Sequence, residues 1–176
     1  MPHAGQEIEN PRTGQRMVFL ATGAETQGEL LRIECWNPAT GTDEPTHVHP
    51  RQESHSEVLS GRLRFRVDGE TREVGPGETV RITAGVPHTF GNHGTELAHW
   101  IQEFRPALRS AEFFEWLFAL GGRGELDEHG MPSLLQLAVS APAYANEIRA
   151  TRPPWPVQRA LFGLLAPVAR RRGLHA

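Results

Sequence analysis

The sequence predicts a mainly β domain followed by a helical region. Between residues 10 and 104, short apolar runs are separated by turn signals such as Asp68-Gly69 and Gly75-Pro76-Gly77. After Pro106 the apolar residues take the spacing of helices. The chain of 176 residues is long enough for one domain with a real core, and too short for two full domains.

Six segments have the length and patterning of strands. The clearest is Arg62–Val67, where apolar residues and arginines alternate, so that one face of the strand is apolar. The expected strands are Met17–Leu20, Leu30–Trp36, Ser56–Leu59, Leu63–Val67, Thr79–Ile82 and Leu97–Phe104.

Three helices are expected after Pro106. The first has Ser110 as its N-cap and ends at Gly121-Gly122. The second runs from Pro132 to about Ala150, and the third from near Pro156 to the arginines 170–172. Their apolar stripes are too large to stay in water, so we expect them to pack on the barrel or on a second copy in a homodimer. These stripes contain Phe113, Phe114, Trp116, Leu117, Leu161, Phe162 and Leu165.

Composition excludes several classes of function. All eighteen basic residues are arginines, so a mechanism that needs a lysine Schiff base is excluded. The formal charge of −3 and the lack of a Gly-rich phosphate loop give no support for a nucleic-acid or nucleotide partner. The single Cys35 excludes an internal disulfide, and the first twenty residues do not resemble a signal peptide, so a cytoplasmic location is expected. The third helix is too short for a membrane span, and Pro167 interrupts it.

Three histidines form a candidate metal site. His47 and His49 are two residues apart, so they share a face if the segment is extended. His88 must come from a neighbouring strand. Neutral imidazole suits Fe, Ni, Cu and Zn, and also Mn together with oxygen ligands, so a divalent metal is predicted without its identity.

The residues around these histidines resemble the two motifs of the cupin superfamily. The first motif has Gly41, then His47-Val48-His49, then Gly61, and the second is Gly85-Val86-Pro87-His88 with Asn92. The resemblance covers about residues 38–104. It implies an antiparallel double-stranded β-helix, a jelly-roll barrel, over residues 1–105, with residues 106–176 as a C-terminal helical extension. It also implies one divalent metal ion bound by His47, His49 and His88.

The glutamate ligand of metal-binding cupins has no clear counterpart. Counted back from Gly61, its position is Ser54, and the nearest carboxylate, Glu53, comes one residue early. If Val58 points into the barrel, then Ser54 and Ser56 also line the cavity, and Glu53 faces outward.

A β-bulge near Gln52 is the alternative, because it would return Glu53 to the interior as a fourth ligand. A site of three histidines and a site that includes Glu53 therefore both remain open. Phe90 and His99 are further candidates for the cavity wall.

The leading functional hypothesis is a metal-dependent cupin that acts on a small organic molecule by dioxygenase-like chemistry. Three neutral ligands leave the charge of the ion uncompensated and a coordination position open, which favours anionic substrates. The alternatives are a non-catalytic cupin that binds or senses a small molecule, and a Zn-dependent cyclase or isomerase of secondary metabolism. The sequence assigns no catalytic residue, so whether the protein is an enzyme stays open.

Overall fold

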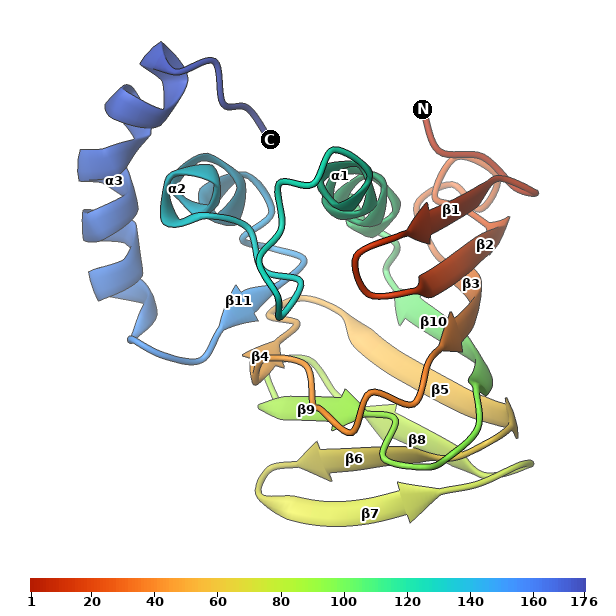
Figure 1. Ribbon diagram of the computed structural model, residues 1–176. Helices are drawn as coiled ribbons and strands as arrows, with labels where there is room; N and C mark the ends of the chain where they lie inside the picture. Colours follow the sequence, from red (N-terminus) through yellow and green to blue (C-terminus); the bar gives the residue numbers. More distant parts are fainter.

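Two antiparallel sheets face each other and form a barrel in the computed structural model, which describes residues 1–176 (Figure 1). The six-stranded sheet has the order β1 (Glu7–Asn10), β2 (Gln15–Ala21), β3 (Leu31–Asn37), β10 (Ala98–Arg105), β5 (Glu53–Ser60) and β8 (Thr79–Ile82). The five-stranded sheet has the order β11 (Arg149–Ala150), β4 (His47–Val48), β9 (His88–Gly91), β6 (Leu63–Val67) and β7 (Glu70–Val74). The mainly β fold expected from the sequence is confirmed.

The core lies between the two sheets and follows the alternation of each strand. Phe19, Ile33, Val58, Leu63 and Trp100 come from five different strands, and all are buried in a single apolar cluster. Because side chains alternate across a strand, the residues between them point to the outside of the barrel. A residue can therefore take part in a site inside the barrel only if its side chain lies on the inner face of its strand.

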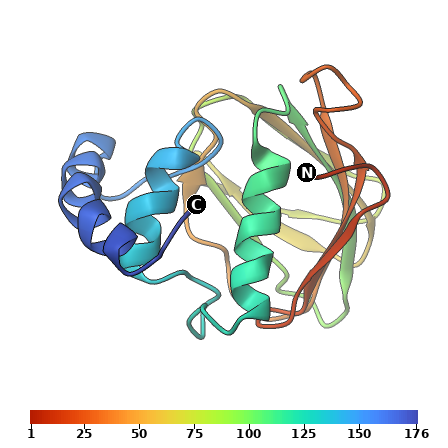
Figure 2. The same ribbon diagram turned by 90° about the horizontal axis from the view of Figure 1, so that it is seen from above.

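The first helix closes one end of this barrel. Helix α1 (Ser110–Gly122) lies over the end of the barrel, with the other helices beside it (Figure 2). Its Ala111 and Phe118 join the apolar core of the barrel. The expected N-cap was wrong by one position, because Arg109 occupies it. Ser110 instead forms a hydrogen bond with the buried side chain of Gln52.

The second helix is shorter than the sequence suggested. Helix α2 (Leu134–Ala143) begins after Ser133, whose side chain accepts a hydrogen bond from the backbone N–H of Gln136. It ends well before Ala150, because residues 149–150 form the short strand β11 and pair with β4. The extension therefore contributes a strand to the same sheet that carries His47.

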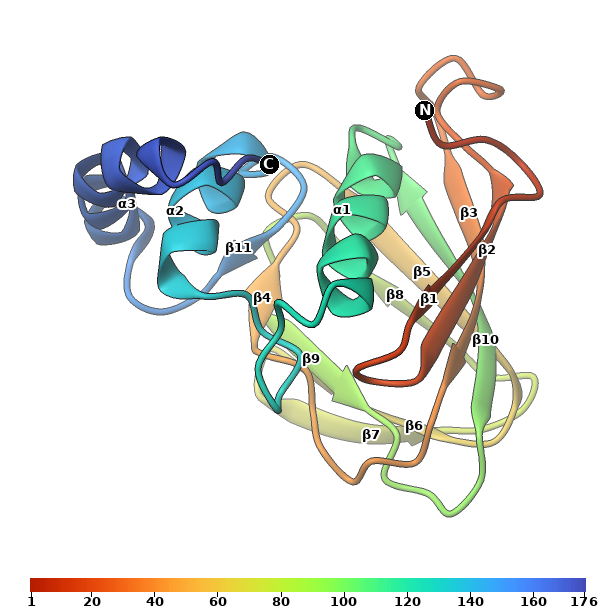
Figure 3. The same ribbon diagram turned by 45° about the horizontal axis from the view of Figure 1, so that its top comes forward.

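Helix α3 (Trp155–Arg171) packs on α2 and lies beside the barrel (Figure 3). Ala166 and Ala169 of α3 meet Val139 of α2 in a second, smaller apolar cluster. None of the helices is long and apolar enough to cross a membrane. The structure describes a single chain, so the homodimer expected from the sequence stays a prediction.

Candidate metal centre

Three histidines converge on the inner surface of the five-stranded sheet. His47 lies in β4 and pairs directly with His88 of the antiparallel neighbour β9, while His49 follows β4. Their ring centroids lie 4.4 Å apart for His47 and His88, and 5.1 Å apart for each pair that includes His49. One ring nitrogen from each residue lies within 4.8 Å of the other two. All three side chains are buried, so the nitrogens share one small enclosed space.

Backbone carbonyl groups fix the tautomer of each ring. The Nδ1 atoms of His47, His49 and His88 lie 2.8, 2.7 and 2.9 Å from the carbonyl oxygens of Pro45, Glu147 and Val86. A carbonyl oxygen only accepts a hydrogen bond, so Nδ1–H must be the donor in each case. Each Nε2 atom is therefore left with a free lone pair, as in histidines that bind metals.

Burial keeps these rings neutral. Burial, together with the charges of the other two histidines, lowers the pKa of His47 to about 3. Burial also lowers the pKa of His49 to about 4, against the hydrogen bond to the Glu147 carbonyl, and it lowers the pKa of His88. Three neutral imidazoles are a donor set that suits a first-row transition metal. The residues present therefore fit a divalent ion.

The sequence of the barrel matches known proteins. Residues 35–102 match the family model described as Cupin domain. Two solved structures share the fold: an RmlC-like cupin from Shewanella frigidimarina and a predicted oxalate decarboxylase from Thermotoga maritima. The Shewanella protein is 23% identical with a TM-score of 0.50, and the match covers 58% of this chain and 86% of the Shewanella chain. The Thermotoga protein is 18% identical with a TM-score of 0.51, and the match covers 59% of this chain and 93% of the Thermotoga chain. Residues 35–102 of the chain therefore form a domain of the cupin superfamily.

A curated relative of this cupin is the quercetin 2,3-dioxygenase of Bacillus subtilis (strain 168). The two sequences are 28% identical over 104 residues, which is 57% of this cupin and 31% of the dioxygenase. This cupin therefore spans about a third of the length of that relative.

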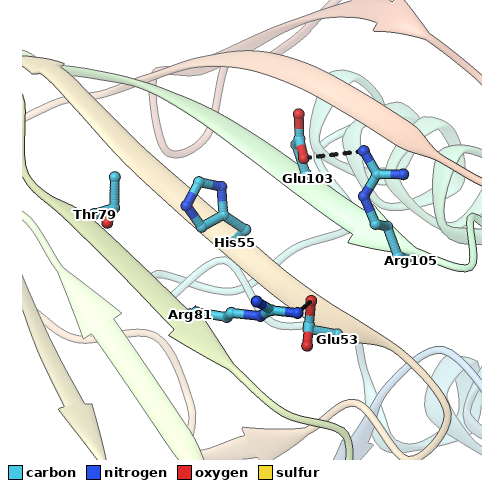
Figure 4. A pocket seen from close by; sticks show the side chains of 6 residues that line it. All are labelled: Glu53, His55, Thr79, Arg81, Glu103 and Arg105. Carbon is cyan, nitrogen blue, oxygen red and sulfur yellow. Dashed lines mark ion pairs between the residues drawn. The ribbon is translucent and has the colours of Figure 1, made fainter.

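Glu53 lies on the other side of the barrel wall from the three histidines. Its carboxylate forms an ion pair of 2.8 Å with Arg81. Both residues line an outer pocket of about 370 Å³ together with His55 and Arg105 (Figure 4). No bulge turns Glu53 inward, because its strand pairs in continuous register with β10 from Glu53 to Glu57 and with β8 from Ser54 to Glu57. The structure therefore does not bring Glu53, the alternative fourth ligand, to the three histidines.

The predicted wall residues divide between the two faces. Ser54 and Ser56 are buried on the inner face, in step with Val58, and Phe90 packs inside the barrel near Trp100. His99 is the exception. It neighbours the inward-facing Trp100 and therefore faces outward. The expectation that His99 lines the cavity is not met.

The surroundings of His99 account for this correction. Its ring stacks on Trp36 at 4.7 Å, and its Nε2 lies 2.8 Å from a carboxylate oxygen of Glu34. The inner position goes to the larger apolar neighbour Trp100, whose burial stabilises the core more than burial of an imidazole would.

Sequence reasoning missed three residues near the site. Gln102 accepts a hydrogen bond of 2.6 Å from Ser56, and could have been found because it has the same parity as Trp100. Glu44 accepts a hydrogen bond from Gln15, and burial raises its pKa to about 7.

The third missed residue is Glu147, whose carbonyl oxygen holds His49. It lies 98 residues further along the chain, in the turn between α2 and β11. No local pattern in the sequence connects the two residues. Only the pairing of β11 with β4 brings them together.

Proposed function

We propose that this cupin binds one divalent metal ion through His47, His49 and His88 and carries out dioxygenase-like chemistry on a small organic molecule. The observation that carries the proposal is the fixed tautomer of all three rings, which leaves each Nε2 with a free lone pair in a buried group whose ligand nitrogens lie within 4.8 Å of one another. The partial similarity to a quercetin 2,3-dioxygenase supports the reaction class.

Three neutral ligands determine which substrates the site favours. With Glu53 on the outer face, no carboxylate belongs to the His47, His49 and His88 group. A redox-active ion bound there supplies a positive centre for an anionic substrate atom and a partner for dioxygen. The substrate class expected is therefore a small molecule that binds as an anion, such as an enolate, a phenolate or a thiolate.

Residues of the barrel interior would hold the rest of the substrate. Phe65, Phe90 and Trp100 form an aromatic wall with ring centroids 5.4 and 5.9 Å apart for successive pairs. The indole N–H of Trp100 is buried and has no hydrogen-bond partner. Because a buried donor without a partner is unfavourable, a substrate oxygen that accepts from this group would gain affinity.

Polar groups next to Trp100, on the inner face of the six-stranded sheet, can orient a flat molecule. Ser56 and Gln102 form a hydrogen-bonded pair on the inner face, and Ser54 lies on the same face. Helix α1 covers one end of the barrel, where its Ala111 and Phe118 join the apolar core. This combination of aromatic surface and a few polar groups is typical of small-molecule sites.

The first experiment measures metal and oxygen together. The purified protein is loaded with Fe, Mn, Ni, Cu or Zn, its bound metal is determined, and oxygen uptake is followed with quercetin as the probe. We expect one bound ion per chain and oxygen uptake with at least one redox-active metal. His88→Ala should lose the ion, whereas His99→Ala should keep it, because His99 lies on the outer face.

Two outcomes separate the alternatives. Binding of Zn alone, with no oxygen uptake, would favour a cyclase or isomerase over an oxygenase. Failure of every metal to bind a folded wild-type protein would contradict the metal centre itself, and would favour a cupin that binds a small molecule without turnover.

A further inference from the structure

Helix α3 is buried along only one face. Gln158, Phe162, Ala166 and Ala169 form its buried side, and its apolar contacts are with α2. Figure 1 shows α3 at the edge of the molecule, on the side of α2 away from α1. Most of its remaining surface faces solvent in this chain.

A stripe of large apolar side chains lies on this exposed surface. Val157, Leu161, Leu164 and Val168 are 53%, 40%, 77% and 43% exposed. Their spacing of four, three and four residues puts them on one side of the helix. A single exposed leucine is ordinary, but a continuous apolar stripe usually marks an interaction surface.

The region around this stripe is strongly basic. Residues 148–176 contain six of the eighteen arginines and none of the twenty-one acidic residues. The first 147 residues therefore have twelve basic and twenty-one acidic residues, and carry a formal charge of −9. The arginines at positions 152, 159, 170, 171 and 172 are exposed, and none of them forms an ion pair.

We propose that α3 docks this protein on a membrane surface that contains anionic lipids. In this arrangement the helix lies in the plane of the interface, with its apolar stripe among the acyl chains and its arginines at the headgroups. The helix does not cross the bilayer, in agreement with its length and composition. Apolar side chains on one face and arginines without acidic partners are the two features that such binding requires.

A second copy of the chain fits the same surface less well. Pairing two α3 helices would bring their arginines together with no acidic residue between them. The helix has 17 residues and is therefore about 25 Å long. Contact through one such helix falls short of the roughly 800 Å² per partner that stable interfaces bury.

The test is flotation of the intact protein with two kinds of vesicle. One is pure phosphatidylcholine, and the other is a three-to-one mixture of phosphatidylcholine and phosphatidylglycerol. We expect binding only to the anionic vesicles, weakened strongly by about 0.5 M salt because the Debye length falls to a few ångströms. Leu164→Glu should reduce the affinity at least tenfold. Leu97→Glu is the matched control, since Leu97 is 51% exposed and precedes β10 in the barrel.

The charge contribution is tested with two triple variants that have the same net charge as each other. Replacing the arginines at 170, 171 and 172 by glutamine should lower the affinity by about fivefold per arginine. The control replaces Arg62, Arg72 and Arg81, which are exposed on the barrel, and should leave binding unchanged. Circular dichroism and metal content should match the wild type in every variant.

Three results would overturn the proposal. The first is equal binding to neutral and anionic vesicles, and the second is no binding to either. The third is a dimer in sedimentation that Leu164→Glu converts to monomers while lipid binding is absent, which would identify the stripe as a contact between copies.

Discussion

Restoring a carboxylate on the inner face of β5 tests the geometry of the metal centre. Ser54 is buried on this face and pairs with Phe104, whose ring centroid lies 5.0 Å from that of His49. A glutamate at position 54 would therefore lie next to Phe104, the residue whose ring contacts His49. A change in an outer partner of a ligand already alters metal affinity about 10–100-fold, so we expect Ser54→Glu to raise the affinity at least about tenfold.

This gain has a measurable size. A ligand at about 100 times its dissociation constant stabilises a protein by about 2.7 kcal/mol, and tenfold tighter binding raises this to about 4.1 kcal/mol. The difference corresponds to about 3–6 °C in melting temperature for a chain of this length. Thermal unfolding of wild type and variant at the same concentration of metal measures the difference directly.

Without metal the same substitution should destabilise the fold. Burial raises the pKa of a carboxyl group, and each unit amounts to about 1.4 kcal/mol. The metal-free variant should therefore lose stability as the pH rises from 5 to 8, by about 2–4 kcal/mol. Both effects can be read from urea unfolding with and without metal.

Ser56→Glu is the matched control. Ser56 is also buried on the inner face, but it bonds Gln102 instead of neighbouring the residue that contacts His49. Ser56→Glu should lose the same amount of folding stability without metal, and it should gain no metal affinity. A folded Ser54→Glu protein whose metal affinity is unchanged or lower would refute the inferred register of β5 against the histidines.

Two further predictions concern a half-buried carboxyl group and backbone conformation. Burial raises the pKa of Glu44 from 4.5 to about 7, so between these pH values the folded protein holds a proton that the unfolded chain releases. The free energy of unfolding should therefore fall as the pH rises from 4.5 to 7. Glu44→Gln should remove this loss and gain up to about 3 kcal/mol on the wild type between pH 4.5 and 7.5 in urea unfolding, whereas parallel curves would contradict the assignment. Gly61 has a φ of +71°, and an added Cβ would lie 2.6 Å from a backbone oxygen of Leu97. Gly61→Ala should therefore cost at least about 2 kcal/mol, against about 1 kcal/mol for Gly69→Ala, which has a similar φ and open space. Equal costs at the two positions would show that the close approach at Gly61 relaxes.

The sequence by itself determined the strands with strong alternation and the three histidines. Leu63–Val67 and Thr79–Ile82 are strands with the expected bounds, because their turns and side-chain periods are local signals. The facing of Ser54, Ser56 and Glu53 also followed from a period of two anchored at Val58. The same rule, applied to β10, would have separated Gln102 on the inner face from His99 on the outer face.

Only the tertiary structure decided which distant residues complete the site. The second helix ends early because strand β11 pairs with β4, and this pairing brings the carbonyl oxygen of Glu147 to within 2.7 Å of His49. Every residue has a backbone carbonyl group, so no pattern of side chains in the sequence predicts which carbonyl contacts His49. Glu44 lacks a local signal for a similar reason, since it is held by hydrogen bonds with Gln15 and Phe90, which are far away in the sequence. Local periodicity determines which face a side chain takes, whereas desolvation and long-range pairing arise only when the sheets and the extension meet.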